Sequence, residues 1–134
     1  SAQGKALAER VMSSVGQCVW VEKESELDVI TAISGSGPAY FFLFIESLAD
    51  AAIALGMNSE SARKVALQTA LGASRLASLS NEDAATLRKN VTSPGGTTER
   101  AVQAFEASDI RGIVAQATQA AARRSVELRK EFGV

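Results

Sequence analysis

The chain has 134 residues, of which 46% are hydrophobic and 22% charged, and this composition is ordinary for one globular domain. A formal net charge of -1 gives no overall attraction to nucleic acid or to an acidic membrane, so we expect neither partner. There is no histidine and one cysteine, Cys18, which excludes a Ser-His-Asp triad, most zinc sites and an internal disulfide. We therefore expect no resident metal, and enzymatic chemistry would have to come from a cofactor, carboxylates or hydroxyls.

The N-terminal part predicts a helix followed by a short strand. Apolar residues recur every four positions over residues 4–15, and Gly16 is suited to end the helix. The next stretch, QCVWVE at residues 17–22, is rich in β-branched and aromatic side chains, which favours a strand. Because a lone strand cannot pair its own backbone groups, it indicates either pairing with another chain or a sheet whose other strands are missing.

After a charged connection at residues 23–28, an apolar stretch leads through SGSGP into a helix from Pro38 to about Leu55. Pro38 suits the first helical position, and Ser36 or Gly37 suits the N-cap. This helix is apolar nearly all round, so we expect it to be buried in a core or between subunits. Because a bundle of about 100 residues covers such a helix poorly, a homodimer is favoured over a monomeric bundle with this helix at its centre.

Two carboxylates, Glu46 and Asp50, lie four residues apart and therefore on one face of this apolar helix. Such a pair could share a proton or bind a metal, but with no histidine nearby a polar seam against a partner helix is the simpler explanation. The two carboxylates also interrupt the longest apolar stretch, so no uninterrupted run reaches the ~20 residues that span a bilayer. With no visible secretory signal, we expect a cytoplasmic protein.

Four further helices are predicted, over residues 59–79, 82–90, 98–107 and 109–132, the last with Asp109 as its N-cap. The sequence after Leu27 is therefore almost wholly helical. This pattern predicts an all-α helical bundle with one short strand near its N-terminus.

The loop SPGGTT, residues 93–98, directly precedes one of these helices and is a candidate anion site. Helix N-termini carry unpaired N–H groups and a partial positive charge, and glycines let a ligand approach the backbone closely. The hydroxyls of Ser93, Thr97 and Thr98 add further donors for a carboxylate or phosphate. On helix physics alone, a turn in which Thr97 or Thr98 merely caps the helix is the simpler explanation.

The stretch SGSGP could act similarly through Ser34 and Ser36, but as a motif it is weak. No lysine follows it, so it is not a Walker loop, and it matches only half of a G-x-G-x-x-G pattern. A tight entry turn that caps the helix at Pro38 is favoured.

Taken together, ISGSGPAYFF and, about fifty residues later, LRKNVTSPGGTTERAVQAFE resemble pyrroline-5-carboxylate reductase, the last enzyme of proline biosynthesis. The second stretch matches the signature of that family at Leu87, Val91, Thr92, Ser93, Pro94, Gly95, Gly96, Thr97, Thr98 and Ala101. The resemblance covers essentially the whole chain, and two long motifs at the expected separation are more specific than either loop alone. The resemblance therefore favours the substrate-loop interpretation over the capped turn.

The resemblance implies a particular domain organisation. These oxidoreductases have a Rossmann domain followed by a helical domain that interleaves with its twin in a homodimer, and dimers often assemble into decamers. Residues 1–28 would be the last helix and strand of a truncated dinucleotide-binding domain, and residues 29–134 the helical dimerisation and substrate-loop domain. The cofactor, NADPH or NADH, would be bound mainly by the missing part, so we expect this chain alone to be inactive.

The resemblance also implies roles for individual residues in the reduction of pyrroline-5-carboxylate to L-proline. The substrate carboxylate would be held by Ser93, Gly95, Gly96 and Thr97, and Thr98 would be the catalytic residue that hydrogen-bonds the ring nitrogen. Glu82 would help to close the pocket through the dimer partner, although Ala84 stands where the family often has proline. Ser34 and Ser36 would lie near the nicotinamide end of the cofactor.

Two alternatives remain open. The chain could act only as an oligomerisation module without catalysis. It could also be the helical domain of a related dehydrogenase acting on another small acid, although such domains should lack TSPGGTT.

Overall fold

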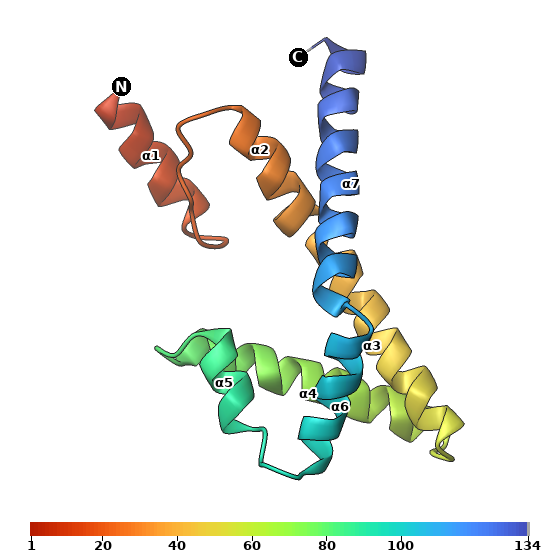
Figure 1. Ribbon diagram of the computed structural model, residues 1–134. Coiled ribbons are helices and arrows are strands. Elements are labelled where there is room, and N and C mark those ends of the chain that lie inside the picture. The colour runs from red at the N-terminus through yellow and green to blue at the C-terminus, as the bar shows by residue number, and fades with distance from the viewer. Residues whose placement is uncertain (134) are drawn as a thin grey trace.

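The structure, a computed structural model, describes residues 1–133 and is built from helices (Figure 1). The elements in chain order are α1 (Ala2–Met12), α2 (Ser25–Ile30), the π-helical turn η1 (Thr31–Gly35), α3 (Gly37–Ala54), α4 (Ser59–Leu79), α5 (Ala84–Asn90), α6 (Thr97–Ala107) and α7 (Ile110–Phe132). The predicted all-α class and the predicted helices after Pro38 are confirmed, with ends that differ by at most two residues.

The predicted strand at residues 17–22 is wrong. Residues 17–21 have no regular secondary structure, and residues 1–133 contain no strand that could pair with them. Without a partner an extended segment leaves its N–H and C=O groups to solvent, so a β-rich composition alone does not make a strand. The segment lies beside α1, where the ammonium of Lys5 is 4.6 Å from the centre of the Trp20 ring.

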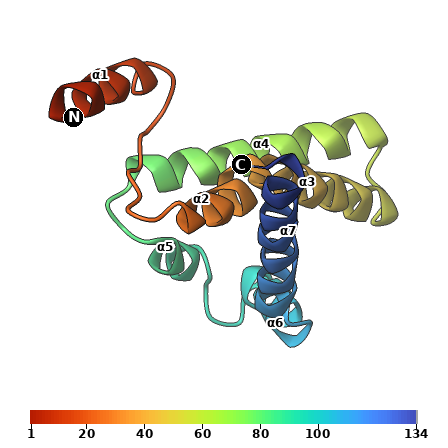
Figure 2. The ribbon, with the colours of Figure 1, turned by 90° about the horizontal axis from the view of Figure 1, so that it is seen from above.

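Helices α2, η1 and α3 follow one another in a nearly continuous helical run (Figures 1 and 2). The predicted positions are confirmed, since Ser36 is the N-cap residue of α3 and Pro38 lies in its first turn, but the predicted tight entry turn is wrong, because the stretch before Ser36 is helical. Ser36 has helical backbone angles and no side-chain cap, and its N–H donates to the Thr31 carbonyl oxygen at 2.9 Å. Pro38 explains the wide turn, because proline lacks an N–H and its ring collides with the carbonyl of Ser34 in a regular α-helix.

The charged connection predicted before this helix is also partly wrong, since helix α2 begins at Ser25. The side chain of Glu26 accepts hydrogen bonds from the N–H groups of Glu22 and Lys23, at 3.0 and 3.1 Å. These bonds fix the chain where it enters α2, in the manner of an acidic residue near a helix N-terminus.

Helices α3 and α4 form a hairpin and pack closely against each other (Figure 2). Gly56, with a φ of 99°, ends α3 as predicted, and Asn58 caps α4 by accepting a bond from the Ser61 N–H at 2.9 Å. The residues buried along the hairpin are all small, namely Gly37, Ala49, Ala62 and Ala66. Small side chains let the two helix backbones approach each other.

Helix α7 packs against α2 and η1 (Figure 1), and two turn residues, Ser108 and Asp109, connect α6 to it. The turn is made by Asp109, which has a left-handed φ of 54° and caps α7 by accepting from the Gly112 N–H at 3.1 Å. Before this turn, the Phe105 ring of α6 lies 6.0 Å from the Phe44 ring of α3. The substrate-loop candidate is thereby carried on an element that contacts both α3 and α7.

A single copy of the chain has almost no hydrophobic core. Among residues 1–133 the buried apolar residues are Ala32, Ala49, Ala62 and Ala66, whereas Phe42 and Leu55 expose 68% and 90% of their surface. Apolar surface of this extent marks a protein interface. The predicted burial of the apolar helix is therefore not met within one chain and requires a further surface.

The run Ser25–Ala54 is also long and apolar enough, by length and composition, to cross a membrane, with a mean hydropathy of 1.3. The helix is longer than expected, because α2 and η1 extend it upstream of Pro38, but Asp28, Glu46 and Asp50 interrupt its apolar sequence, so the prediction of no uninterrupted apolar run of this length stands. The core helix of a soluble protein passes the same test, so the finding by itself is weak evidence.

Candidate functional site

The loop of residues 91–96 connects α5 to α6 and has the backbone of an open helix N-terminus. Gly95 has a φ of 72°, a left-handed conformation that favours glycine. Gly96 is the N-cap of α6 and offers no side chain to the first turn. The prediction that Thr97 or Thr98 caps the helix is therefore wrong, because both threonines are already helical. Their N–H groups belong to the helix end that no capping side chain covers, which suits an anion.

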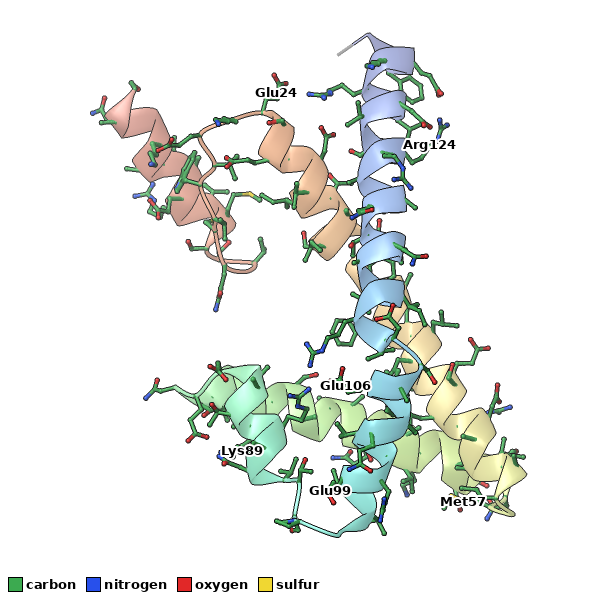
Figure 3. The ribbon with its side chains drawn as sticks, in the orientation of Figure 1. Glu24, Met57, Lys89, Glu99, Glu106 and Arg124 are labelled. Atoms are coloured by element: carbon green, nitrogen blue, oxygen red, sulfur yellow. The ribbon has the colours of Figure 1, made fainter. Side chains whose placement is uncertain are left out.

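Two of the predicted donors are bonded inside the loop itself. The Gly96 N–H donates to the Ser93 carbonyl oxygen at 3.0 Å, and the Gly95 N–H donates to Glu99 Oε2 at 2.9 Å. Glu99 lies on the first turn of α6 and reaches back over the loop, as a capping-box carboxylate does (Figure 3). The donors that remain for a ligand are the exposed hydroxyls of Ser93, Thr97 and Thr98 and the N–H groups of the two threonines.

Glu82 is linked to the beginning of this loop. Its Oε2 accepts a hydrogen bond from Asn90 Nδ2 at 3.0 Å, and Asn90 directly precedes residue 91. The neighbouring Asp83 caps α5 by accepting from the Thr86 N–H at 2.7 Å. That backbone bond, followed by one from the Thr86 side chain, lowers the pKa of Asp83. Ala84 occupies the first helical position of α5, a position that proline also fits.

An ion-pair cluster fixes the two helices that flank the loop. Glu106 of α6 lies 3.2 Å from Arg88 of α5 and 2.8 Å from Arg111 of α7 (Figure 3). The hydrogen bond from Arg111, together with the charges of Arg111 and Arg88, lowers the pKa of the Glu106 carboxyl. Sequence reasoning missed these residues, because nothing in their spacing indicates that α5, α6 and α7 meet.

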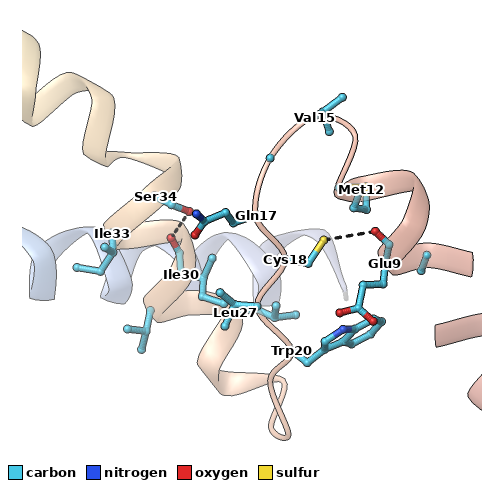
Figure 4. A pocket seen from close by; sticks show the side chains of 14 residues that line it. Glu9, Met12, Val15, Gln17, Cys18, Trp20, Leu27, Ile30, Ile33 and Ser34 are labelled. Atoms are coloured by element: carbon cyan, nitrogen blue, oxygen red, sulfur yellow. Dashed lines mark hydrogen bonds between the residues drawn. The ribbon is translucent and has the colours of Figure 1, made fainter. Parts of the chain in front are cut away.

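Ser34 and Ser36 lie elsewhere, in and beside the π turn. Ser34 Oγ donates to the Ile30 carbonyl oxygen at 3.0 Å, and Ser34 lines an open cleft of about 790 Å³ (Figure 4). The cleft is mainly apolar and lies between α1, the extended segment, α2 and η1. Its lining includes Trp20, Leu27 and Ile33. In both overall views this region is separated from the loop of residues 91–96 (Figures 1 and 2).

The structure thus brings part of the predicted site together and leaves part of it apart. Ser93, Gly95, Gly96, Thr97 and Thr98 share one loop and helix end, to which Glu82 is tied through Asn90. The two serines of the π turn are not joined to this loop within one chain. Within residues 1–133 no group of three or more His, Cys, Asp or Glu side chains is placed to hold a metal ion.

A helical domain whose apolar faces are uncovered in a single copy is typical of the class of dimerisation domains. Residues 24–128 match the family model for pyrroline-5-carboxylate reductase dimerisation, and the chain belongs to this family. The family description names dimerisation, and the apolar helices of one copy are largely uncovered.

Relatives and solved structures agree with this family. The chain is 46% identical over 126 residues to a pyrroline-5-carboxylate reductase of Pseudomonas aeruginosa, covering 94% of this chain and 46% of the relative. A pyrroline-5-carboxylate reductase structure from Coxiella burnetii superposes with a TM-score of 0.92 at 44% identity, over 96% of this chain and 47% of the other. A Plasmodium falciparum pyrroline carboxylate reductase structure with NADP bound superposes with a TM-score of 0.81 at 34% identity, over 93% and 47%. The chain thus spans about half the length of the relatives it matches.

Proposed function

We propose that this chain is the helical half of a pyrroline-5-carboxylate reductase, which reduces 1-pyrroline-5-carboxylate to L-proline with NADPH or NADH in proline biosynthesis. The observation that carries the proposal is the N-terminus of α6, where Gly96 leaves the first turn without a side-chain cap beside three exposed hydroxyls. Residues 1–28 belong in this proposal to the dinucleotide-binding part of the enzyme. Residues 29–134 form the dimerisation and substrate-loop part.

The substrate carboxylate binds at the start of α6. The Ser93 hydroxyl and the Thr97 N–H donate to its oxygens, and the positive end of the helix dipole favours its charge. Gly95 and Gly96 contribute by letting the substrate approach the backbone, since their own N–H groups are bonded within the loop. Glu82, held by Asn90, closes the pocket together with the partner subunit.

Thr98 is the catalytic residue of the proposal. Its hydroxyl, one residue further along the helix, hydrogen-bonds the ring nitrogen once the carboxylate is held at the helix end. This contact orients the C=N bond for reduction and holds the proton on the nitrogen that becomes the amine of proline. A protonated imine accepts hydride readily, so the absence of histidine from the chain is no obstacle.

The residues of the π turn fit the nicotinamide end of a dinucleotide. The Ser34 hydroxyl donates a hydrogen bond to the Ile30 carbonyl oxygen. Its own oxygen is therefore left to accept a hydrogen bond from a carboxamide N–H. The apolar lining of the cleft, with Trp20 and Ile33, suits a planar ring, and Ser36 follows directly after the turn. When bound, NADPH or NADH supplies the hydride. No Gly-rich phosphate loop occurs in these 134 residues, so the phosphates bind outside this chain.

In this proposal the reductase forms an interleaved homodimer, and the dimers assemble further into decamers. The protein is located in the cytoplasm. The apolar side chains that α3 and α4 expose, such as Phe42 and Leu71, support interleaving, because they are left uncovered within one chain. An interleaved partner would also bring a π-turn cleft and a substrate loop together from different copies.

The test is the oxidation of NADPH in the presence of pyrroline-5-carboxylate, measured on the complete gene product and on these 134 residues. The proposal predicts substrate-dependent oxidation by the complete product and none by the 134 residues alone. Absence of activity in the complete product, with both NADPH and NADH, would refute the reductase assignment. The chain would then be an oligomerisation module.

A further inference from the structure

The π turn η1 is an unusual element to find between two α-helices, and it adjoins the cleft described above. π-helical turns are rare and often occur at functional sites, because their wider geometry changes where side chains point. Pro38 accounts for the break in the α-helix, but a break can be accommodated in many conformations. Side-chain contacts are therefore needed to keep the backbone in this one conformation.

Tyr40 supplies one such contact. Its hydroxyl donates to the Ala32 carbonyl oxygen at 3.0 Å, so a residue of α3 bonds to the backbone inside the π turn. Ala32 and Tyr40 lie on either side of Pro38 in the sequence. Proline has no N–H, so one backbone hydrogen bond of the helix is missing there. Tyr40 is half-buried and Ala32 is 1% exposed, so water competes little for this carbonyl.

Asp28 holds the same turn from its other end. Its Oδ1 accepts from Ser125 Oγ at 2.8 Å, and its Oδ2 lies 3.1 Å from Arg129 Nη2. Asp28 precedes the first residue of the π turn by three positions, and α7, which carries both partners, also packs against the turn. The turn is therefore clamped between α7 and Tyr40.

We propose that Tyr40 is a positioning residue of the reductase, whose hydroxyl fixes the π turn so that Ser34 faces the cleft and accepts from the carboxamide of the pyridine nucleotide. This inference rests on the proposed function and adds a role for a residue that lines neither the loop nor the cleft. Without the hydroxyl, the turn relaxes and Ser34 leaves the orientation that its bond to Ile30 defines. Cofactor binding weakens, while the carboxylate site at the start of α6 stays intact.

The experiment uses the Tyr40→Phe variant of the complete gene product, which removes one oxygen and keeps the ring. Loss of a hydrogen bond of this kind predicts that the KM for NADPH rises roughly threefold to tenfold. The KM for pyrroline-5-carboxylate should change by less than about twofold. The matched control is Ser47→Ala, which removes a hydroxyl-to-carbonyl bond of 2.7 Å from the regular part of the same helix and should leave both constants unchanged.

A second readout does not depend on turnover. 3-Fluorotyrosine placed at position 40 should show a shifted ¹⁹F resonance when NADP⁺ is added without substrate. The inference is overturned if Tyr40→Phe leaves the KM for NADPH at the wild-type value, or lowers only thermal stability. If the variant does not fold, an unshifted ¹⁹F resonance at saturating NADP⁺ overturns it equally. An inactive wild-type protein would instead refute the proposed function.

Discussion

Asp28 Oδ2 of α2 lies 3.1 Å from the guanidinium Nη2 of Arg129 of α7, which joins the beginning of the long helical run to the end of the last helix. Asp28 is 8% exposed and is the buried charged residue of the described chain. A buried carboxylate is tolerated when it is paired and hydrogen-bonded, as it is here by Arg129 and Ser125. The pair therefore sets the register between α7 and α2.

We expect Asp28→Ala to lower the free energy of unfolding by about 1–3 kcal/mol, because it leaves the partners of the carboxylate unsatisfied. The control is Glu131→Ala, which breaks an exposed ion pair with Arg124 of 2.8 Å and should cost less than about 1 kcal/mol. Urea titrations at one fixed protein concentration measure both variants. Equal effects of the two substitutions would contradict the assigned role of Asp28.

In the complete reductase, Thr98→Ala should lower turnover more than tenfold, the scale expected when a positioned polar contact to the reacting group is lost. Steady-state kinetics with saturating cofactor measure this effect. Thr69→Ala, which removes a threonine bond to the Val65 carbonyl oxygen within α4, serves as the control and should keep wild-type turnover. Wild-type kinetics in Thr98→Ala would show that the role of this threonine is misassigned.

Gly95→Ala tests the shape of the substrate loop. At a φ of 72° an alanine costs about 1–2 kcal/mol, although the added Cβ would meet no atom within 4 Å. We expect a raised KM for pyrroline-5-carboxylate with little change in the KM for NADPH. Gly72→Ala is the control, because its Cβ is equally unhindered and its backbone is not left-handed. A loop that keeps its substrate KM after Gly95→Ala would not have the proposed function.

The Glu106 cluster predicts a dependence of stability on pH. Since the pKa of Glu106 is lowered in the folded chain, chiefly by its hydrogen bond from Arg111, its contribution is present above the unfolded pKa and is lost as pH falls through the folded pKa. The urea midpoint of Glu106→Gln should therefore fall below that of the wild type at neutral pH. The two midpoints should converge in acid, and a constant difference across this range would contradict the assignment.

Most of the helices could be predicted from the sequence, because their boundaries carry local signals. Asn58 and Asp109 cap their helices, and Gly56 ends α3 with a left-handed φ. The π turn could not be predicted, since a Ser-Gly-Pro stretch has the same local signature whether a helix begins there or passes through. The contacts that hold the turn are the packing of α7, which is distant in sequence, and the bond from Tyr40 to Ala32 across Pro38, which no local signature predicts.

The candidate site could likewise be predicted from the sequence only in part. The motif identified the residues of the loop, but not that Gly96 would be the N-cap or that Glu99 would occupy the Gly95 N–H. Those details depend on the path of the backbone. The strand prediction failed for a related reason, because the composition of residues 17–22 describes what a strand prefers and not whether a partner is present.

The central structural claim is that a second copy completes the core of this chain, and sedimentation equilibrium of the 134 residues tests it most directly. The account predicts twice the mass of one chain at micromolar concentration. It also predicts a shift toward one chain in Phe42→Glu, since Phe42 exposes 68% of its surface on α3 and a charge there opposes burial. A folded wild-type chain that sediments as a single copy at all concentrations would contradict the account.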